Sequence, residues 1–89
     1  MMKRLYLDTK YGMRDARDLW KNRMDGYISG ILNDIENGGG LTFDKISKIY
    51  NHFNTIAEVD EPFELIWFAS DEVCVYWPND RWRVTFKLK

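Results

Sequence analysis

Hydrophobic and polar residues alternate most regularly in the last third of the chain. From Trp82 to Leu88, every second residue is apolar, and Arg, Thr and Lys occupy the positions between. A period of two is typical of a strand with one buried face. Two more β-prone runs, Phe63–Ala69 and Val73–Trp77, precede it and are separated by short polar segments. The pattern predicts a three-stranded antiparallel meander.

The length of the last loop sets the expected register of this meander. If Pro78–Arg81 is a four-residue loop, the strands on either side pair directly across it. The expected pairs are Trp77 with Trp82, Val75 with Val84 and Val73 with Phe86. All six side chains then lie on one face, which supports this register.

The first third of the chain suggests a strand followed by a helix. Lys3–Thr9 alternates between polar and apolar residues and predicts a short strand that ends at Gly12. Apolar residues then recur at helical spacing from Met13 to Ile35. One continuous helix of that length would be long for so small a domain. Gly26 disfavours a helix interior, so we expect a kink or break near Asp25-Gly26.

A second helix is expected after the glycine run Gly38–Gly40, which can adopt the left-handed conformation that ends helices. Thr42 is a favourable N-cap. The helix should bury one apolar stripe, consisting of Phe43, Ile46, Ile49, Tyr50 and Phe53. Pro62 ends the acidic connector that follows.

Together these elements predict a single α+β domain over residues 1–89. Two or three helices should pack on a three- to four-stranded antiparallel sheet with a C-terminal β-meander, in the order β-α(α)-α-β-β-β. Two arrangements stay open. Either the helices cover one face, leaving a partly apolar second face with Ile66, Phe68, Cys74 and Tyr76, or one helix covers each face. A homodimer that buries the second face is an alternative.

Composition supports a folded domain with a dense aromatic core. Apolar residues make up 45% of the 89 residues, and there are four Trp, five Tyr and five Phe, so disorder is disfavoured. One cysteine excludes an internal disulfide framework. No apolar run is long enough to span a membrane, and Lys3-Arg4 is not followed by the apolar core of a secretory signal. We expect a cytoplasmic protein.

Catalytic signatures are weak. His52 is the only histidine, and we expect it to be solvent-facing or structurally bonded. Cys74 lies in a strand interior and should be a small buried hydrophobe. The glycine run lacks the Gly-Lys-Ser/Thr sequence of a phosphate-binding loop, so it should be a cap and connector. The prediction is a protein that is not an enzyme and has no metal or cofactor.

Charge is distributed unevenly although the net charge is −1. Residues 1–23 carry seven basic and three acidic side chains, residues 24–80 carry two and eleven, and residues 81–89 carry four and none. Pairing of the ends with the middle is one explanation, and a charged recognition surface is another.

Two candidate surfaces follow from this distribution. The first, the acidic-aromatic surface, lies next to Phe63 and Trp67 and consists of Glu58, Asp60, Glu61, Glu64, Phe68, Asp71, Glu72 and Tyr76. Carboxylates around exposed rings suit docking to a basic protein groove. The second, the basic surface, combines one face of the predicted first helix with the last strand and consists of Arg14, Arg17, Lys21, Arg81, Arg83 and Lys87. It would contact phosphates.

The favoured hypothesis is a small, non-catalytic protein-binding module. In its specific form it is a phage- or mobile-element-type inhibitor of a host defence nuclease or toxin, acting in the host cytoplasm. A nucleic-acid-binding accessory protein is the second hypothesis. The third is a protein that binds or sequesters a small ligand, such as a nucleotide, in an aromatic pocket between helix and sheet.

Overall fold

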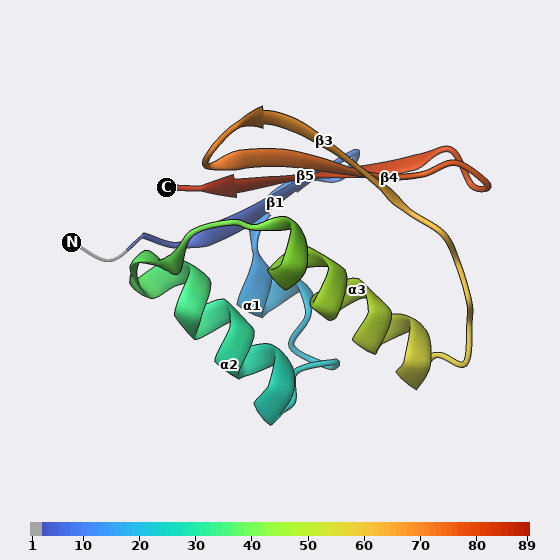
Figure 1. Ribbon diagram of the computed structural model, residues 1–89, viewed down its shortest axis with the longest axis horizontal. Coiled ribbons are helices and arrows are strands. Elements are labelled where there is room, and N and C mark those ends of the chain that lie inside the picture. The colour runs from blue at the N-terminus through green and yellow to red at the C-terminus, as the bar shows by residue number, and fades with distance from the viewer. Residues whose placement is uncertain (1–2) are drawn as a thin grey trace.

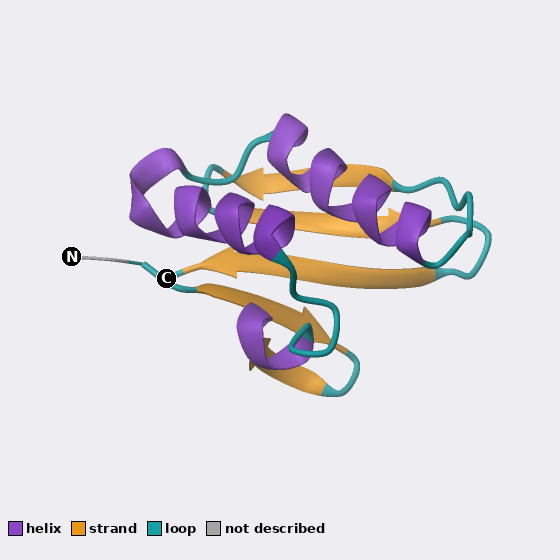
Figure 2. Cartoon of the chain, turned by 90° about the horizontal axis from the view of Figure 1, so that it is seen from below, coloured by secondary structure: helices purple, strands orange, loops and turns teal. Residues whose placement is uncertain are grey.

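The computed structural model describes residues 3–89, which form one antiparallel sheet with all helices on one of its faces (Figures 1 and 2). This confirms the α+β class and shows that the helices cover one face only. The elements in chain order are β1 (Leu5–Thr9), β2 (Gly12–Asp15), α1 (Ala16–Leu19), α2 (Gly26–Asp34), the π-helical turn η1 (Ile35–Gly39), α3 (Phe43–Ile56), β3 (Glu64–Ala69), β4 (Glu72–Trp77) and β5 (Trp82–Leu88).

The sheet has five strands in the order β2-β1-β5-β4-β3, and every neighbouring pair is antiparallel. The predicted meander and its register are confirmed, since Trp77 pairs with Trp82 and Val75 with Val84. The N-terminal strand β1 joins the other side of β5, where Leu7 pairs with Phe86. The central strand is therefore β5, and β2 and β3 are the two edges.

The prediction of a helix from Met13 onward is wrong for its first residues. Residues 12–15 form β2, which folds back on β1 through a tight turn at Lys10-Tyr11, with Thr9 paired to Gly12. Gly12 has φ +104°, a left-handed conformation that glycine adopts without strain. The sheet therefore has one more strand than the predicted maximum of four.

The break near Asp25-Gly26 is confirmed. The short helix α1 is capped by the Asp15 side chain, which accepts a hydrogen bond from the Arg17 amide. After an irregular segment, Asp25 caps α2 by accepting from the Ile28 amide. The glycine run then ends the helix as predicted, with Gly38 at φ +110°.

Helix α3 begins as predicted at Thr42, whose hydroxyl accepts from the Lys45 amide. Its buried stripe holds Ile46, Ile49, Tyr50 and Phe53. Phe43 is an exception, because its side chain is 65% exposed. It stands at the first position of the helix, where the sheet no longer covers it.

The core lies between α2, α3 and the helix-facing side of the sheet. Its centre is aromatic: Tyr50 contacts Trp77 edge-to-face at a centroid distance of 4.9 Å, and Trp20 contacts Phe53 at 5.0 Å. Aromatic rings favour such tilted contacts over parallel stacking. Burial in this cluster raises the pKa of the Tyr50 hydroxyl far above its usual value.

Candidate protein-binding surface

The edge strand β3 exposes far more apolar surface than a strand of this sheet should. Its sequence, Glu-Leu-Ile-Trp-Phe-Ala, is apolar except for the first residue. Ile66 is 47% exposed, Trp67 41% and Phe68 62%. An exposed edge also leaves one row of backbone N–H and C=O groups unpaired. The strand therefore offers both main-chain hydrogen bonds and apolar side chains to a partner.

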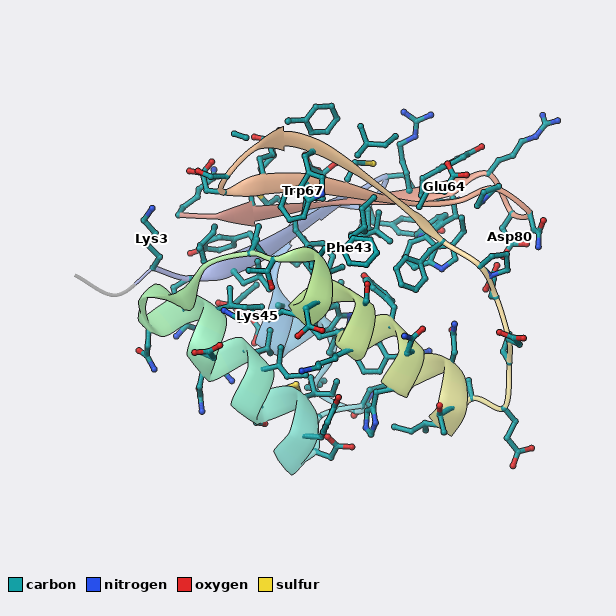
Figure 3. All side chains as sticks on the ribbon, in the orientation of Figure 1. Lys3, Phe43, Lys45, Glu64, Trp67 and Asp80 are labelled. Carbon is teal, nitrogen blue, oxygen red and sulfur yellow. The ribbon has the colours of Figure 1, made fainter. Side chains whose placement is uncertain are left out.

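The register shows that this exposure extends to both faces of the strand. Leu65 pairs with Val75 and therefore points to the helix side, where Trp67 also points. Figure 3 shows the Trp67 side chain on the side of β3 that faces α3. Ile66 pairs with Cys74 and points to the open side of the sheet. A strand added at this edge would find apolar contacts above and below it.

The other edge of the sheet shows how such an edge is usually kept from pairing. Strand β2 has four residues, and its sequence Gly-Met-Arg-Asp carries two charges. Short, charged edges disfavour pairing with other chains. In β3 there is no Lys or Arg, and only a register shift between Trp67 and Ala69 interrupts the ladder.

The predicted acidic-aromatic surface is divided between the two ends of β3. Glu64 and its cross-strand partner Tyr76 lie at the end nearer the α3–β3 connector. Phe68, Asp71 and Glu72 lie at the other end, around the β3–β4 turn. The remaining members, Glu58, Asp60 and Glu61, belong to the connector. The residues are thus arranged along one edge rather than in one cluster.

This arrangement gives the edge a strongly negative margin. From Glu58 to Glu72 the chain has six carboxylates and no Lys or Arg. None of the six takes part in an ion pair within the part of the chain that the structure describes. Their charge is therefore available to a positively charged partner.

The helix that should carry the predicted basic surface does not form as expected, because residues 12–15 belong to a strand and α1 has only four residues. Arg14 lies in β2, Arg17 in α1 and Lys21 in the segment after it. Arg17 is engaged internally and donates to the Asn33 side chain and to Glu36, each at 2.7 Å. Three residues expected on one helical face are thus distributed over three structural elements.

The basic residues of the last strand are also partly engaged. Arg81 lies in the β4–β5 turn, with φ +53°. The Arg83 guanidinium lies 5.9 Å from the centroid of the Tyr76 ring, and the Lys87 ammonium is 3.6 Å from an Asp8 carboxylate oxygen. Both contacts are on the open face of the sheet, where opposite charges are interleaved.

The remaining candidate residues have structural roles. His52 Nε2 lies 2.6 Å from Asp25 Oδ2, and its ring stacks on Tyr27, so the expectation of a structurally bonded histidine is confirmed. Cys74 is buried, as predicted. Among residues 3–89, no group of three or more His, Cys, Asp or Glu side chains is arranged to hold a metal ion.

Sequence reasoning missed two features of the structure. It did not place β3 at an edge, and it assigned the exposed Phe43 to the core. The edge position has no local signal, because strand order depends on where β1 inserts. Comparisons of the chain with protein-family models, curated proteins and solved structures found no match. Within the described residues, no helix has the length and apolar character needed to cross a membrane.

Proposed function

We propose that this protein is a non-catalytic protein-binding module that adds its β3 edge to the sheet of a basic partner. The observation that carries this proposal is the exposed apolar sequence of β3 at an unprotected sheet edge. In β-strand addition, main-chain hydrogen bonds supply affinity, and side-chain contacts supply specificity.

Charge favours a basic partner. The partner strand would lie alongside Glu64, with the Asp71-Glu72 turn at one end and the acidic connector at the other. Lys or Arg on that strand would meet carboxylates that have no cation of their own. Such complementarity speeds association and excludes acidic competitors.

The more specific form of the proposal is inhibition. A nuclease or a toxin that acts on nucleic acid has a basic groove, and an acidic edge with aromatic anchors would compete for it. This protein would then act in the cytoplasm as an anti-defence or immunity-like inhibitor. The support for this form is the charge distribution and the small size of the module.

An affinity capture with matched variants tests the proposal. Phe68→Lys places a charge on the exposed edge, whereas Ile56→Lys does the same at a side chain that is 56% exposed on α3, away from the edge. We expect wild type and Ile56→Lys to retain one stoichiometric basic protein, identified by mass spectrometry. Phe68→Lys should retain at least tenfold less of this protein.

Backbone amide exchange then locates the interface. In the purified complex, the β3 amides should exchange more slowly than in the free protein, and β2 amides should not change. Capture of a partner that binds Phe68→Lys as well as wild type would refute the proposal. Co-purification of nucleic acid without a protein would also refute it.

A further inference from the structure

A second site lies at one end of the molecule, apart from β3. An open groove of about 550 Å³ is formed where the β1–β2 and β4–β5 turns meet the C-terminal half of α3. Small-molecule sites in proteins typically measure about 300–1,000 Å³. The β4–β5 turn and the α3–β3 connector both run at this end of the molecule (Figure 1), and Asp80 is labelled there in Figure 3.

The wall of this groove is aromatic. Trp77 and Trp82, which pair across β4 and β5, line it together with Tyr50. Tyr11 adds its ring from the β1–β2 turn, 6.2 Å from that of Trp82. The faces of Trp and Tyr rings attract cations, and Trp does so most strongly.

Tyr50 adds a polar group to this wall. The residue is 7% exposed, and no side-chain hydrogen bond among the described residues uses its hydroxyl. Every fully buried side-chain polar atom in that part of the chain does have a partner. The hydroxyl must therefore reach accessible space, and the groove is the space that Tyr50 lines. It is free to bond a ligand there.

Two carboxylates lie at the mouth of the groove. Glu61 comes from the α3–β3 connector. Asp80 comes from the β4–β5 turn, which joins Trp77 to Trp82. They are close enough for hydrogen bonding, and Asp80 raises the pKa of Glu61. No Lys, Arg or His among residues 3–89 lies within ion-pair distance of either carboxylate. The Asn54 amide holds the connector in place by donating to the Glu61 carbonyl at 3.0 Å.

The protein already places an ammonium on part of this wall. Lys10 Nζ lies 4.9 Å from the Trp82 ring centroid and 5.1 Å from that of Tyr11. A cation therefore packs against these two rings, at a residue that does not itself line the groove. The two carboxylates also disfavour phosphate, although Arg23 lines the groove and its charge acts on the Tyr50 hydroxyl.

We infer that this groove binds an alkylammonium cation, with its charge between Glu61 and Asp80 and its alkyl groups against Trp77 and Trp82. The Tyr50 hydroxyl would accept or donate a hydrogen bond deeper in the groove. This inference does not depend on the β3 strand, since no β3 residue lines the groove, although Glu61 belongs both to the groove and to the acidic connector.

The test compares choline with its neutral isostere 3,3-dimethylbutan-1-ol, using the indole N–H resonances of Trp77 and Trp82. Choline should shift both resonances in a saturable way. The neutral isostere should bind at least tenfold more weakly, because it lacks the charge. Asp80→Asn and Glu61→Gln should each weaken choline binding about tenfold, which corresponds to about 1.4 kcal/mol.

Matched controls separate this site from general electrostatics. Glu58→Gln removes a carboxylate from the same connector outside the groove, so it should leave choline affinity within twofold of wild type. Asp80 lies in an exposed turn, and circular dichroism will check that the variants remain folded. The inference is overturned if choline and its isostere bind equally, if neither shifts the indoles, or if Glu58→Gln weakens binding as much as Asp80→Asn.

Discussion

At the scale of single residues, Glu36 in the turn η1 connects strand β1 with helix α1. Among the described residues it is the only charged side chain that is buried, at 4% exposure. Its carboxylate accepts from the Leu5 amide at 2.9 Å and from the Arg17 guanidinium at 2.7 Å. The Leu5 amide lies beyond the end of the β1–β2 ladder, so Glu36 supplies the bond that β2 does not.

Replacing Glu36 should therefore destabilise the fold in a way that depends on its acceptor atoms. Glu36→Leu leaves the buried Leu5 amide without an acceptor and removes the carboxylate that pairs with Arg17, which keeps only its bond to Asn33. We expect a loss of about 3 kcal/mol in the free energy of unfolding. Glu36→Gln keeps one acceptor oxygen and should lose about half as much. Urea denaturation at pH 7 measures both. Equal stability of Glu36→Leu and wild type would contradict this role.

The lowered pKa of Asp25 leads us to expect a specific dependence of stability on pH. The Ile28 amide, followed by His52, lowers the pKa of this carboxyl below its usual value of 3.8. A carboxyl with a lowered pKa in the folded state stabilises the fold above its unfolded-state pKa. That stabilisation is lost as the pH falls through the folded-state pKa. We therefore expect the melting temperature to fall below about pH 4.

Asp25→Asn isolates this contribution, because Asn is also a good N-cap but does not titrate. Between pH 5 and pH 2 its melting temperature should fall less than that of wild type. Asp44→Asn, in the first turn of α3, is the matched control, since Asp44 pairs with exposed Lys48. If the melting temperature of Asp25→Asn falls with pH as steeply as that of wild type, Asp25 does not contribute to the pH dependence of stability.

At the scale of elements, the sequence predicted what local pattern determines. The alternation from Trp82 to Leu88 and the length of the Pro78–Arg81 loop were sufficient for the register of β4 and β5. The N-cap Thr42 gave the start of α3, because capping involves neighbouring residues, and Gly26 gave the break at which α2 begins.

Elements that depend on tertiary contacts were not predictable in this way. Met13, Ala16 and Trp20 fit helical spacing, yet residues 12–15 pair with β1, and the turn Lys10-Tyr11 has none of the usual hairpin signals. The candidate surface follows the same division. Its carboxylates and Phe68 were evident from composition and alternation, but the exposure of Trp67 depends on β3 lying at an edge of the sheet.

At the scale of the whole molecule, the apolar edge and its acidic margin have opposite effects on self-association. A symmetric antiparallel pairing of two β3 strands centred on Ile66 would oppose Leu65 of one copy to Trp67 of the other, which is favourable. The same geometry would bring the acidic connector of each copy to the Asp71-Glu72 turn of the other. Carboxylates would then face carboxylates at both ends of the new pairing, where the chain has no cation.

Salt should decide between these effects. Electrostatic screening lengths are about 10 Å at 0.1 M salt and about 3 Å at 1 M. We therefore expect sedimentation to give the monomer mass of 10.7 kDa at 0.1 M NaCl and a mass closer to a dimer at 1 M. Phe68→Glu, which in this register would oppose Glu64 of the other copy, should stay monomeric at both concentrations, and Ile56→Lys should behave as wild type. A dimer at low salt that dissociates at high salt would contradict this prediction. Attraction between opposite charges would then hold the two copies together, and the acidic margin would not disfavour self-association.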